Sequence, residues 1–230
     1  MSKKLLLVVC CVVVLGLGSA WAGVTGTTDP TKFGDTVDWC QFGCAASQIP
    51  TPANFTSAGG NTGEVGLVGS LQGFYNLQDP TSWNGDYPPG MGLVYNGVAY
   101  GNSPAAIATT FDEGLYGAGA YIQANYYGPF TATITLFDAL DQVLGSYTTT
   151  GVSGDDPSTL LFIGALDTSA DVWAAQFDVI DQFGNEDFSI GMEGLATSPA
   201  VGTPEPSSLM LLGSAFGLVG VIRRKIAEVK

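Results

Sequence analysis

Four oxygen-bearing side chains lie within ten residues of one another in the last third of the chain: Asp178, Asp181, Asn185 and Asp187. Gly184 marks a tight turn among them. Calcium takes about six to eight oxygen ligands in a flexible geometry, so this spacing predicts a Ca²⁺ site. The alternative is an acidic turn that is only solvated, because the spacing differs from that of an EF-hand loop.

A second group of side chains suits carbohydrate. Trp83 and Tyr87 lie in a turn-rich segment together with Asn and Asp residues. Exposed Trp and Tyr rings stack on sugar rings, and their polar tips bond to hydroxyl groups. We therefore predict a glycan-binding platform at Trp83 and Tyr87, with Tyr121, Tyr126 and Tyr127 as further candidates. The alternative is that these rings fill the core.

The residue types argue against an enzyme. The chain has no histidine, which removes Ser-His and Cys-His pairs and imidazole ligands. Paired carboxylates alone can hydrolyse a glycosidic bond. The adjacent Asp112 and Glu113, however, face opposite ways in a regular strand. We expect no enzyme activity, with a glycoside hydrolase as the minor alternative.

Charge is distributed unevenly along the chain. The formal net charge is −14, and six of the seven basic residues lie near the two ends. Residues 23–206 contain 20 acidic residues, a single basic residue, Lys32, and no arginine, for a formal charge of −19. A nucleic acid partner is excluded, because phosphates must be neutralised by Lys and Arg.

The N-terminal segment has the parts of a secretory signal peptide. Lys3 and Lys4 precede an apolar run over residues 5–17, and Ala20-Trp21-Ala22 forms an A-x-A cleavage site. We predict a signal helix that directs the chain to the secretion machinery and is removed by signal peptidase. The alternative is an uncleaved anchor, for which the run is short.

Two cysteines, Cys40 and Cys44, remain after that cleavage. A close, even pair in an exported protein indicates a small disulfide. The alternative is a redox or metal site, although two Cys without His make a poor metal site.

The C-terminal end has three parts in a fixed order. A short proline-rich motif comes first, an apolar run over residues 209–222 follows, and a basic cluster comes last. The run predicts a transmembrane helix with the basic cluster on the cytoplasmic side. The alternative is a buried terminal helix. The motif is Pro204, Glu205 and Pro206, and the basic cluster is Arg223, Arg224 and Lys225.

These three parts closely resemble the PEP-CTERM sorting tail of exported proteins from Gram-negative bacteria that make exopolysaccharide. Most such tails have an apolar residue where Thr203 stands. The same tail is also named after ice-binding proteins that carry it. The resemblance implies cleavage by an exosortase, a transient inner-membrane anchor, and a final place on the cell surface or in the extracellular matrix.

The body between the two ends has the pattern of an all-β protein. Residues 130–137 read FTATITLF, with Thr131, Thr133 and Thr135 on one face. Asn84-Gly85 and Asn96-Gly97 are hairpin-turn dipeptides. About nine such strands, with no long helix, predict an antiparallel β-sandwich, specifically a jelly roll. Residues 117–126, 131–137, 162–164 and 177–190 also resemble β-sandwich domains of the carbohydrate-binding type.

The predicted organisation has five segments. They are a signal peptide at 1–22, a loop-rich lead segment at 23–62, the β-sandwich at 63–198, a linker at 199–203 and the sorting tail at 204–227. We expect a non-enzymatic surface or matrix protein that binds exopolysaccharide with help from Ca²⁺. The alternative is a structural or adhesive surface protein without a specific ligand.

Overall fold

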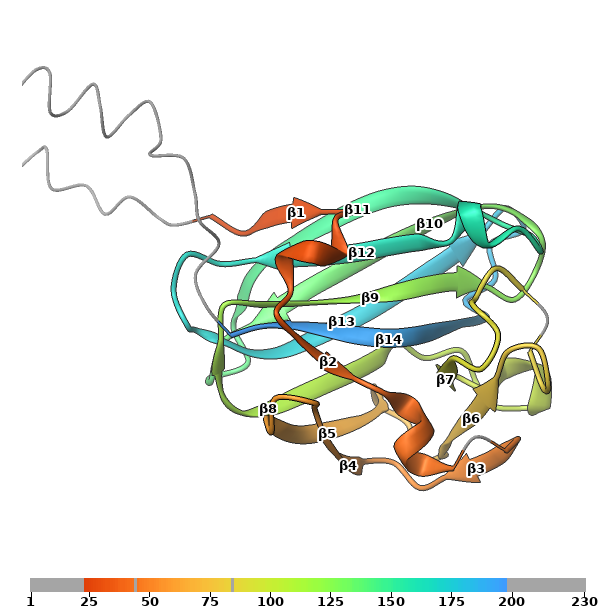
Figure 1. The fold of residues 1–230 in the computed structure, drawn as a ribbon, viewed down its shortest axis with the longest axis horizontal. Coiled ribbons are helices and arrows are strands. Elements are labelled where there is room, and N and C mark those ends of the chain that lie inside the picture. The colour runs from red at the N-terminus through yellow and green to blue at the C-terminus, as the bar shows by residue number, and fades with distance from the viewer. Residues whose placement is uncertain (1–22, 44, 84, 198–230) are drawn as a thin grey trace, which may run out of the picture.

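The computed structural model describes residues 23–43, 45–83 and 85–197. Two antiparallel sheets pack face to face as a sandwich (Figure 1), which confirms the predicted all-β class. No helix in these residues is long and apolar enough to cross a membrane. The predicted signal helix and transmembrane helix lie outside them. The jelly-roll subtype stays a prediction.

The first sheet contains eight strands. Seven of them follow the order β1-β12-β9-β14-β7-β6-β3, and β2 pairs with the second half of β14. The strands are β1 (Thr25–Thr27), β2 (Asp35–Val37), β3 (Ser47–Ile49), β6 (Phe74–Gln78), β7 (Gly92–Tyr95), β9 (Gly117–Ala124), β12 (Leu161–Leu166) and β14 (Phe188–Ala196).

The second sheet contains six strands in the order β11-β10-β13-β8-β5-β4. It includes the longest strands of the described chain, because its central members have uninterrupted period-two patterns. The strands are β4 (Ala53–Thr56), β5 (Thr62–Leu67), β8 (Ile107–Leu115), β10 (Gly128–Phe137), β11 (Val143–Ser153) and β13 (Val172–Asp181).

The lead segment differs from the loop-rich expectation. Residues 23–62 supply strands β1–β4 to both sheets, together with the 3-10 helices η1 (Pro30–Lys32) and η2 (Trp39–Phe42). Strands of three or four residues are too short to show an alternating pattern, so the sequence alone did not reveal them. The boundary expected at residue 63 falls inside β5.

The core lies between the sheets and takes alternate residues from each strand. Phe130, Ala132, Ile134 and Leu136 of β10 are buried there, as the alternation predicted. Trp39 of η2 is fully buried, and its indole N–H donates to the carbonyl of Gly191 at 2.9 Å. This bond ties the lead segment to β14.

The two outer faces of the sandwich are covered differently. Over the first sheet, Phe33 of the lead segment packs on Phe162 with 5.2 Å between ring centroids. The loop of residues 79–91 covers another part of the same face, packing on Leu93 and Tyr95 of β7. The outer face of the second sheet instead presents hydroxyl side chains such as the exposed Thr131.

One acidic side chain lies in the core. Glu193 of β14 is fully buried and accepts a hydrogen bond from the hydroxyl of Thr109 on β8, with 2.8 Å between Oγ1 and Oε1. Its Oε2 has no hydrogen-bond partner among the described residues. Burial raises the pKa of Glu193 to about 8 from the ordinary value of 4.5, so the folded chain holds it neutral at pH 7.

This neutral acid predicts a specific pH dependence of stability. Between about pH 4.5 and pH 8 the folded chain keeps a proton that the unfolded chain has lost, so stability falls by about 1.4 kcal/mol per pH unit as the pH rises. Glu193→Gln keeps the shape and the acceptor without the charge. We expect urea unfolding of this variant to lose that slope and to show higher stability at pH 8. Exposed Glu113→Gln is the control, and an unchanged slope in Glu193→Gln would contradict the assignment.

Candidate functional site

Three exposed aromatic residues lie on two neighbouring loops at one end of the sandwich. Tyr126 is 50% exposed, Tyr127 46% and Phe183 69%. The rings of Tyr126 and Phe183 meet edge to face, with 6.3 Å between their centroids and 83° between their planes. We call Tyr126, Tyr127 and Phe183 the aromatic end.

Strand pairing explains why these residues meet. Tyr126 and Tyr127 lie in the loop between β9 and β10, and Phe183 lies in the loop between β13 and β14. β10 pairs with β13 so that Phe130 lies opposite Asp181. β9 pairs with β14 in the other sheet, with Ala124 opposite Phe188. The two loops therefore cross between the sheets side by side.

Hydrogen bonds hold the two loops together. Gln182 donates from Nε2 to the carbonyl of Tyr127 at 3.0 Å. The backbone N–H of Asn125 donates to the carbonyl of Asp187 at 2.8 Å, and its Nδ2 donates to Oδ2 of Asp187 at 2.9 Å. Asp187 also accepts from the Tyr95 hydroxyl at 2.5 Å. These hydrogen bonds fix the positions of the two loops that carry the aromatic end.

Asp181 shapes the loop that carries Phe183. Its Oδ1 accepts the backbone N–H groups of Phe183 at 2.7 Å and Asn185 at 2.8 Å, and its Oδ2 accepts Nδ2 of Asn185 at 2.9 Å. Burial pushes the pKa of Asp181 upward. The bonds from Asn185 and the loop N–H groups outweigh that effect, so the net pKa is below its ordinary value.

The four side chains expected to bind calcium do not form one ligand set. Asp181 and Asn185 bond to each other, and Asp187 bonds to Tyr95. Asp178 instead accepts from Gln176 on the outer face of β13. Across the described ranges, no three His, Cys, Asp or Glu side chains are grouped to hold a metal. The spacing in sequence reflected a hydrogen-bonded turn, with the side chains directed to different partners.

Trp83 and Tyr87 are not exposed, which corrects the expected platform. Trp83 is 7% exposed and Tyr87 is 1% exposed, because their loop folds over the outer face of the first sheet. The Trp83 N–H donates to Oε1 of Gln123 at 3.0 Å, and the Tyr87 hydroxyl donates to the carbonyl of Ser189 at 2.7 Å. Both polar tips are therefore used inside the fold.

Of the other tyrosine candidates, one is packed against the fold and two are exposed. Tyr121 is partly buried and packs its ring against Phe162 at 5.2 Å. Tyr126 and Tyr127 are exposed, as a platform requires. Phe183 was not among the candidates, although an aromatic residue inside a polar turn just before Gly184 is a local signal of exposure.

An acidic group orients one ring of the aromatic end. The Tyr127 hydroxyl hydrogen-bonds to Asp155, and this bond raises the pKa of Tyr127 to about 12. The neighbouring Asp86 is buried and accepts from the Gly154 N–H at 3.2 Å and the Thr159 hydroxyl at 2.9 Å. Burial raises the pKa of Asp86, and the charge of Asp155 adds to that rise. These contacts anchor the segment that carries Asp155.

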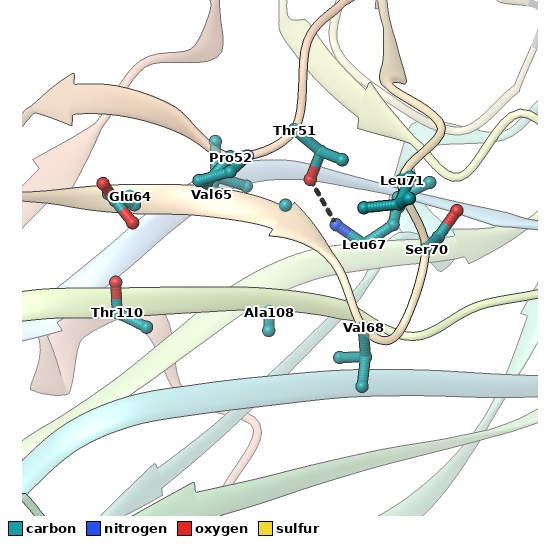
Figure 2. A pocket seen from close by; sticks show the side chains of 11 residues that line it. Thr51, Pro52, Glu64, Val65, Leu67, Val68, Ser70, Leu71, Ala108 and Thr110 are labelled. Carbon is teal, nitrogen blue, oxygen red and sulfur yellow. Dashed lines mark hydrogen bonds between the residues drawn. The ribbon is translucent and has the colours of Figure 1, made fainter.

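A shallow hollow of about 250 Å³ lies elsewhere on the second sheet, over β5 and β8. Figure 2 shows Glu64 and Thr110 on these two strands, and Leu71 in the loop that follows β5. Thr51 braces this region by accepting the N–H of Leu67 at 3.0 Å (Figure 2). None of the lining residues is aromatic, so the hollow lacks the stacking surface expected for sugars.

The remaining predicted residues are only partly within the described ranges. Cys40 is disulfide-bonded. Cys44 lies outside the described residues, so the Cys40–Cys44 pairing stays a prediction. The sorting residues also lie outside, namely Pro204, Glu205, Pro206, Arg223, Arg224 and Lys225.

Comparison with protein families identifies a sorting motif in the C-terminal segment. Residues 203–225 match the PEP-CTERM protein-sorting motif. The chain carries a PEP-CTERM sorting tail. This tail implies export, a transient membrane anchor and an exosortase as processing partner. No curated protein matches the chain in sequence.

Several solved structures show a distant likeness to this chain. A DUF4465 family protein from Bacteroides caccae has 13% identity and a TM-score of 0.40, over 70% of this chain and 97% of its own. The module CsCBM6-3 from Clostridium stercorarium, solved with cellobiose, has 13% identity and a TM-score of 0.28, over 73% and 95%. A mutant of the family 29 carbohydrate-binding module CBM29-2 has 14% identity and a TM-score of 0.27, over 64% and 98%. Scores this low carry no argument about ligands.

The role of Asp181 in holding its loop can be tested by substitution. Asp181→Ala removes three hydrogen bonds to a charged acceptor, so we expect a loss of about 2 kcal/mol at pH 7. Because the folded pKa of Asp181 is lowered, the difference from wild type should shrink as the pH falls below 3.8. Urea unfolding measures both effects.

Asp178→Ala is the matched control, since Asp178 lies on the same strand and, among the described residues, accepts a single hydrogen bond, from Gln176. Equal losses from the two substitutions would contradict the role given to Asp181.

Proposed function

We propose that this exosortase-sorted protein is a non-enzymatic surface or matrix component whose β-sandwich binds a neutral polysaccharide at the aromatic end. The observation that carries the proposal is the braced pair of exposed rings, Tyr126 and Phe183, beside the hydroxyl-bearing Tyr127. An isolated exposed aromatic residue needs no explanation, but a group of three on two mutually bonded loops favours a binding role.

The chemistry of this end suits sugars. An aromatic face attracts the C–H groups of a pyranose ring, and nearby polar groups bond to its hydroxyls. Gln182 and Asn185 lie in the same loop as Phe183, and the carboxylate of Asp155 bonds to Tyr127. Because the loops are already held by hydrogen bonds, little conformational freedom is lost when a glycan binds.

The charge of the body favours a neutral glycan. Residues 23–206 carry a formal charge of −19, so a polymer rich in uronic acids or sulfate would be repelled. Lys32 is the single basic residue of that part, and it lies in η1, which contacts β12. Neutral sugars bind without an ion-pairing partner.

The acidic residues give little support to an enzyme. Glycosidases use two carboxyl groups that flank a solvent-accessible bond. Glu193 is fully buried in the core, and Asp86 is 1% exposed beneath its loop. We infer that the protein binds glycans and leaves them intact.

Glycan binding should depend on the aromatic end. We expect Tyr126→Ala and Phe183→Ala each to weaken binding to the exopolysaccharide of the producing organism by about tenfold, since a ring contact contributes roughly 1 kcal/mol beyond its buried area. Affinity electrophoresis in gels with neutral and uronic-acid polysaccharides measures both affinity and charge preference.

Leu140→Ala is the control, because Leu140 is an exposed apolar residue at the opposite end of β10. Absence of retardation by any neutral polysaccharide would refute glycan binding and favour a purely structural or adhesive protein.

Sorting should depend on the proline-rich motif. Mass spectrometry of the released wild-type chain should show a form that begins at Gly23 and ends near Pro206. Glu205→Ala should stay full-length at the C-terminus and remain in the membrane fraction, because the enzyme would lose its recognition sequence. Pro199→Ala, outside the matched residues 203–225, should be released normally. Release of Glu205→Ala at the wild-type level would contradict the proposal.

A further inference from the structure

One sheet edge is much longer than the others among the described strands. The first sheet ends in β1 and β3, which have three residues each, and the second sheet ends on one side in β4, which has four. Its other edge is β11, which has 11 residues and is the longest strand described. Figure 1 shows β11 along the rim of the sandwich, beside β1.

In the described part of the chain, the backbone of β11 is paired on one side only, by β10. Between Val143 and Ser153, the N–H and C=O groups of β11 that face β10 are hydrogen-bonded to β10. In an antiparallel pair, alternate residues direct their backbone groups away from the partner. Within the described chain, no backbone hydrogen bond from any strand or loop other than β10 reaches residues 143–153. An array of donors and acceptors about eight residues long therefore faces outward, from Gly145 to Val152.

The usual protection of such an edge is missing from β11. Natural edge strands are short or carry Lys, Pro or a bulge that blocks further pairing. Residues 143–153 contain no charged residue and no proline, and the single register shift lies at the start of the strand, opposite Phe137. Tyr147, the three threonines 148–150 and Val152 have high β propensity.

The neighbouring strand β1 does not cover this edge. Gly26 of β1 packs against the inner side of β11, where an added Cβ would lie 1.9 Å from the ring of Tyr147. The contact is with a side chain, and the backbone pairing of β1 is with β12. Among the residues that the structure describes, the outward N–H and C=O groups of β11 thus have no partner strand.

We propose that β11 pairs with β11 of a second copy of this chain, antiparallel about a two-fold axis. The six-stranded sheets of the two copies would then form one continuous sheet. A strand that pairs with itself in this way needs no other partner, as in isologous dimers. The rest of the body repels a second copy through its charge of −19, whereas β11 is a neutral stretch. A strand of this length therefore offers the closest approach with the least repulsion.

The outer face of β11 supports the same pairing. Thr150, Thr148 and Ser146 lie directly opposite Thr131, Thr133 and Thr135 of β10. The hydroxyl oxygens of Thr133 and Thr148 are 3.0 Å apart. Cross-strand pairs of hydroxyl residues stabilise a sheet. Two-fold pairing extends this row of hydroxyl groups across the new interface.

The ends of the strand limit the affinity and make it depend on salt. Asp138 and Asp141 lie in the hairpin before β11, and Asp155 and Asp156 follow it. Antiparallel pairing brings the hairpin of one copy near the Asp155–Asp156 segment of the other. The interface is also small, so we expect a weak dimer that strengthens as salt screens the carboxylates.

Sedimentation velocity of the processed, secreted protein tests the proposal. We expect a monomer in about 20 mM NaCl and a concentration-dependent dimer in about 500 mM NaCl, since the Debye length falls from about 20 Å to about 4 Å. Hydrogen–deuterium exchange should show added protection of residues 143–153 in the dimer. The β4 edge, residues 53–56, should be unchanged.

Two matched double variants separate this edge from other surfaces. Thr148→Glu with Thr150→Glu should raise the dimer dissociation constant by about tenfold or more. Thr133→Glu with Thr131→Glu adds the same charge one strand further in and should have a smaller effect. A monomer under all conditions overturns the proposal, and so does a dimer that both variants weaken equally or that leaves residues 143–153 unprotected.

Discussion

The pairing of β10 with β13 is the interaction on which the surfaces of this protein depend. Its register places Phe130 opposite Asp181, which sets the loop before β10 beside the loop after β13. Tyr126 and Phe183 meet for that reason. The same register buries Ile134 and turns the threonines of β10 to solvent. A slip of one residue would reverse both faces of the strand, so the aromatic end and the core are fixed together.

Unequal covering of the two sheets decides where a ligand or partner can approach. The lead segment and the loop of residues 79–91 cover much of the outer face of the first sheet, and they bury Phe33, Trp83 and Tyr87 in doing so. The outer face of the second sheet keeps its polar, hydroxyl-rich surface. Aromatic residues on the first sheet thus contribute to stability, while those at the end of the second sheet contribute an accessible surface.

Carboxyl groups have three different roles in this acidic chain. Asp181 and Asp187 organise the loops of the aromatic end by accepting N–H and O–H groups. Glu193 is neutral in the core, where burial keeps its proton. The many exposed acids set the repulsion between copies and between the protein and anionic polymers. The composition gives their number, but burial and partners decide which role each one has.

The sequence by itself determined the features that are encoded locally. The sorting tail is a linear motif, and the alternation of β10 depends only on neighbouring residues, so both could be predicted and both are confirmed. Exposure and proximity are different, because they depend on what packs across the sheets. Only the tertiary structure placed Trp83 in the interior, brought Phe183 to Tyr126, directed Asp181 and Asp187 to separate partners, and set Thr148 against Thr133. These outcomes depend on strand register and on loops that fold back, which join residues far apart in the chain.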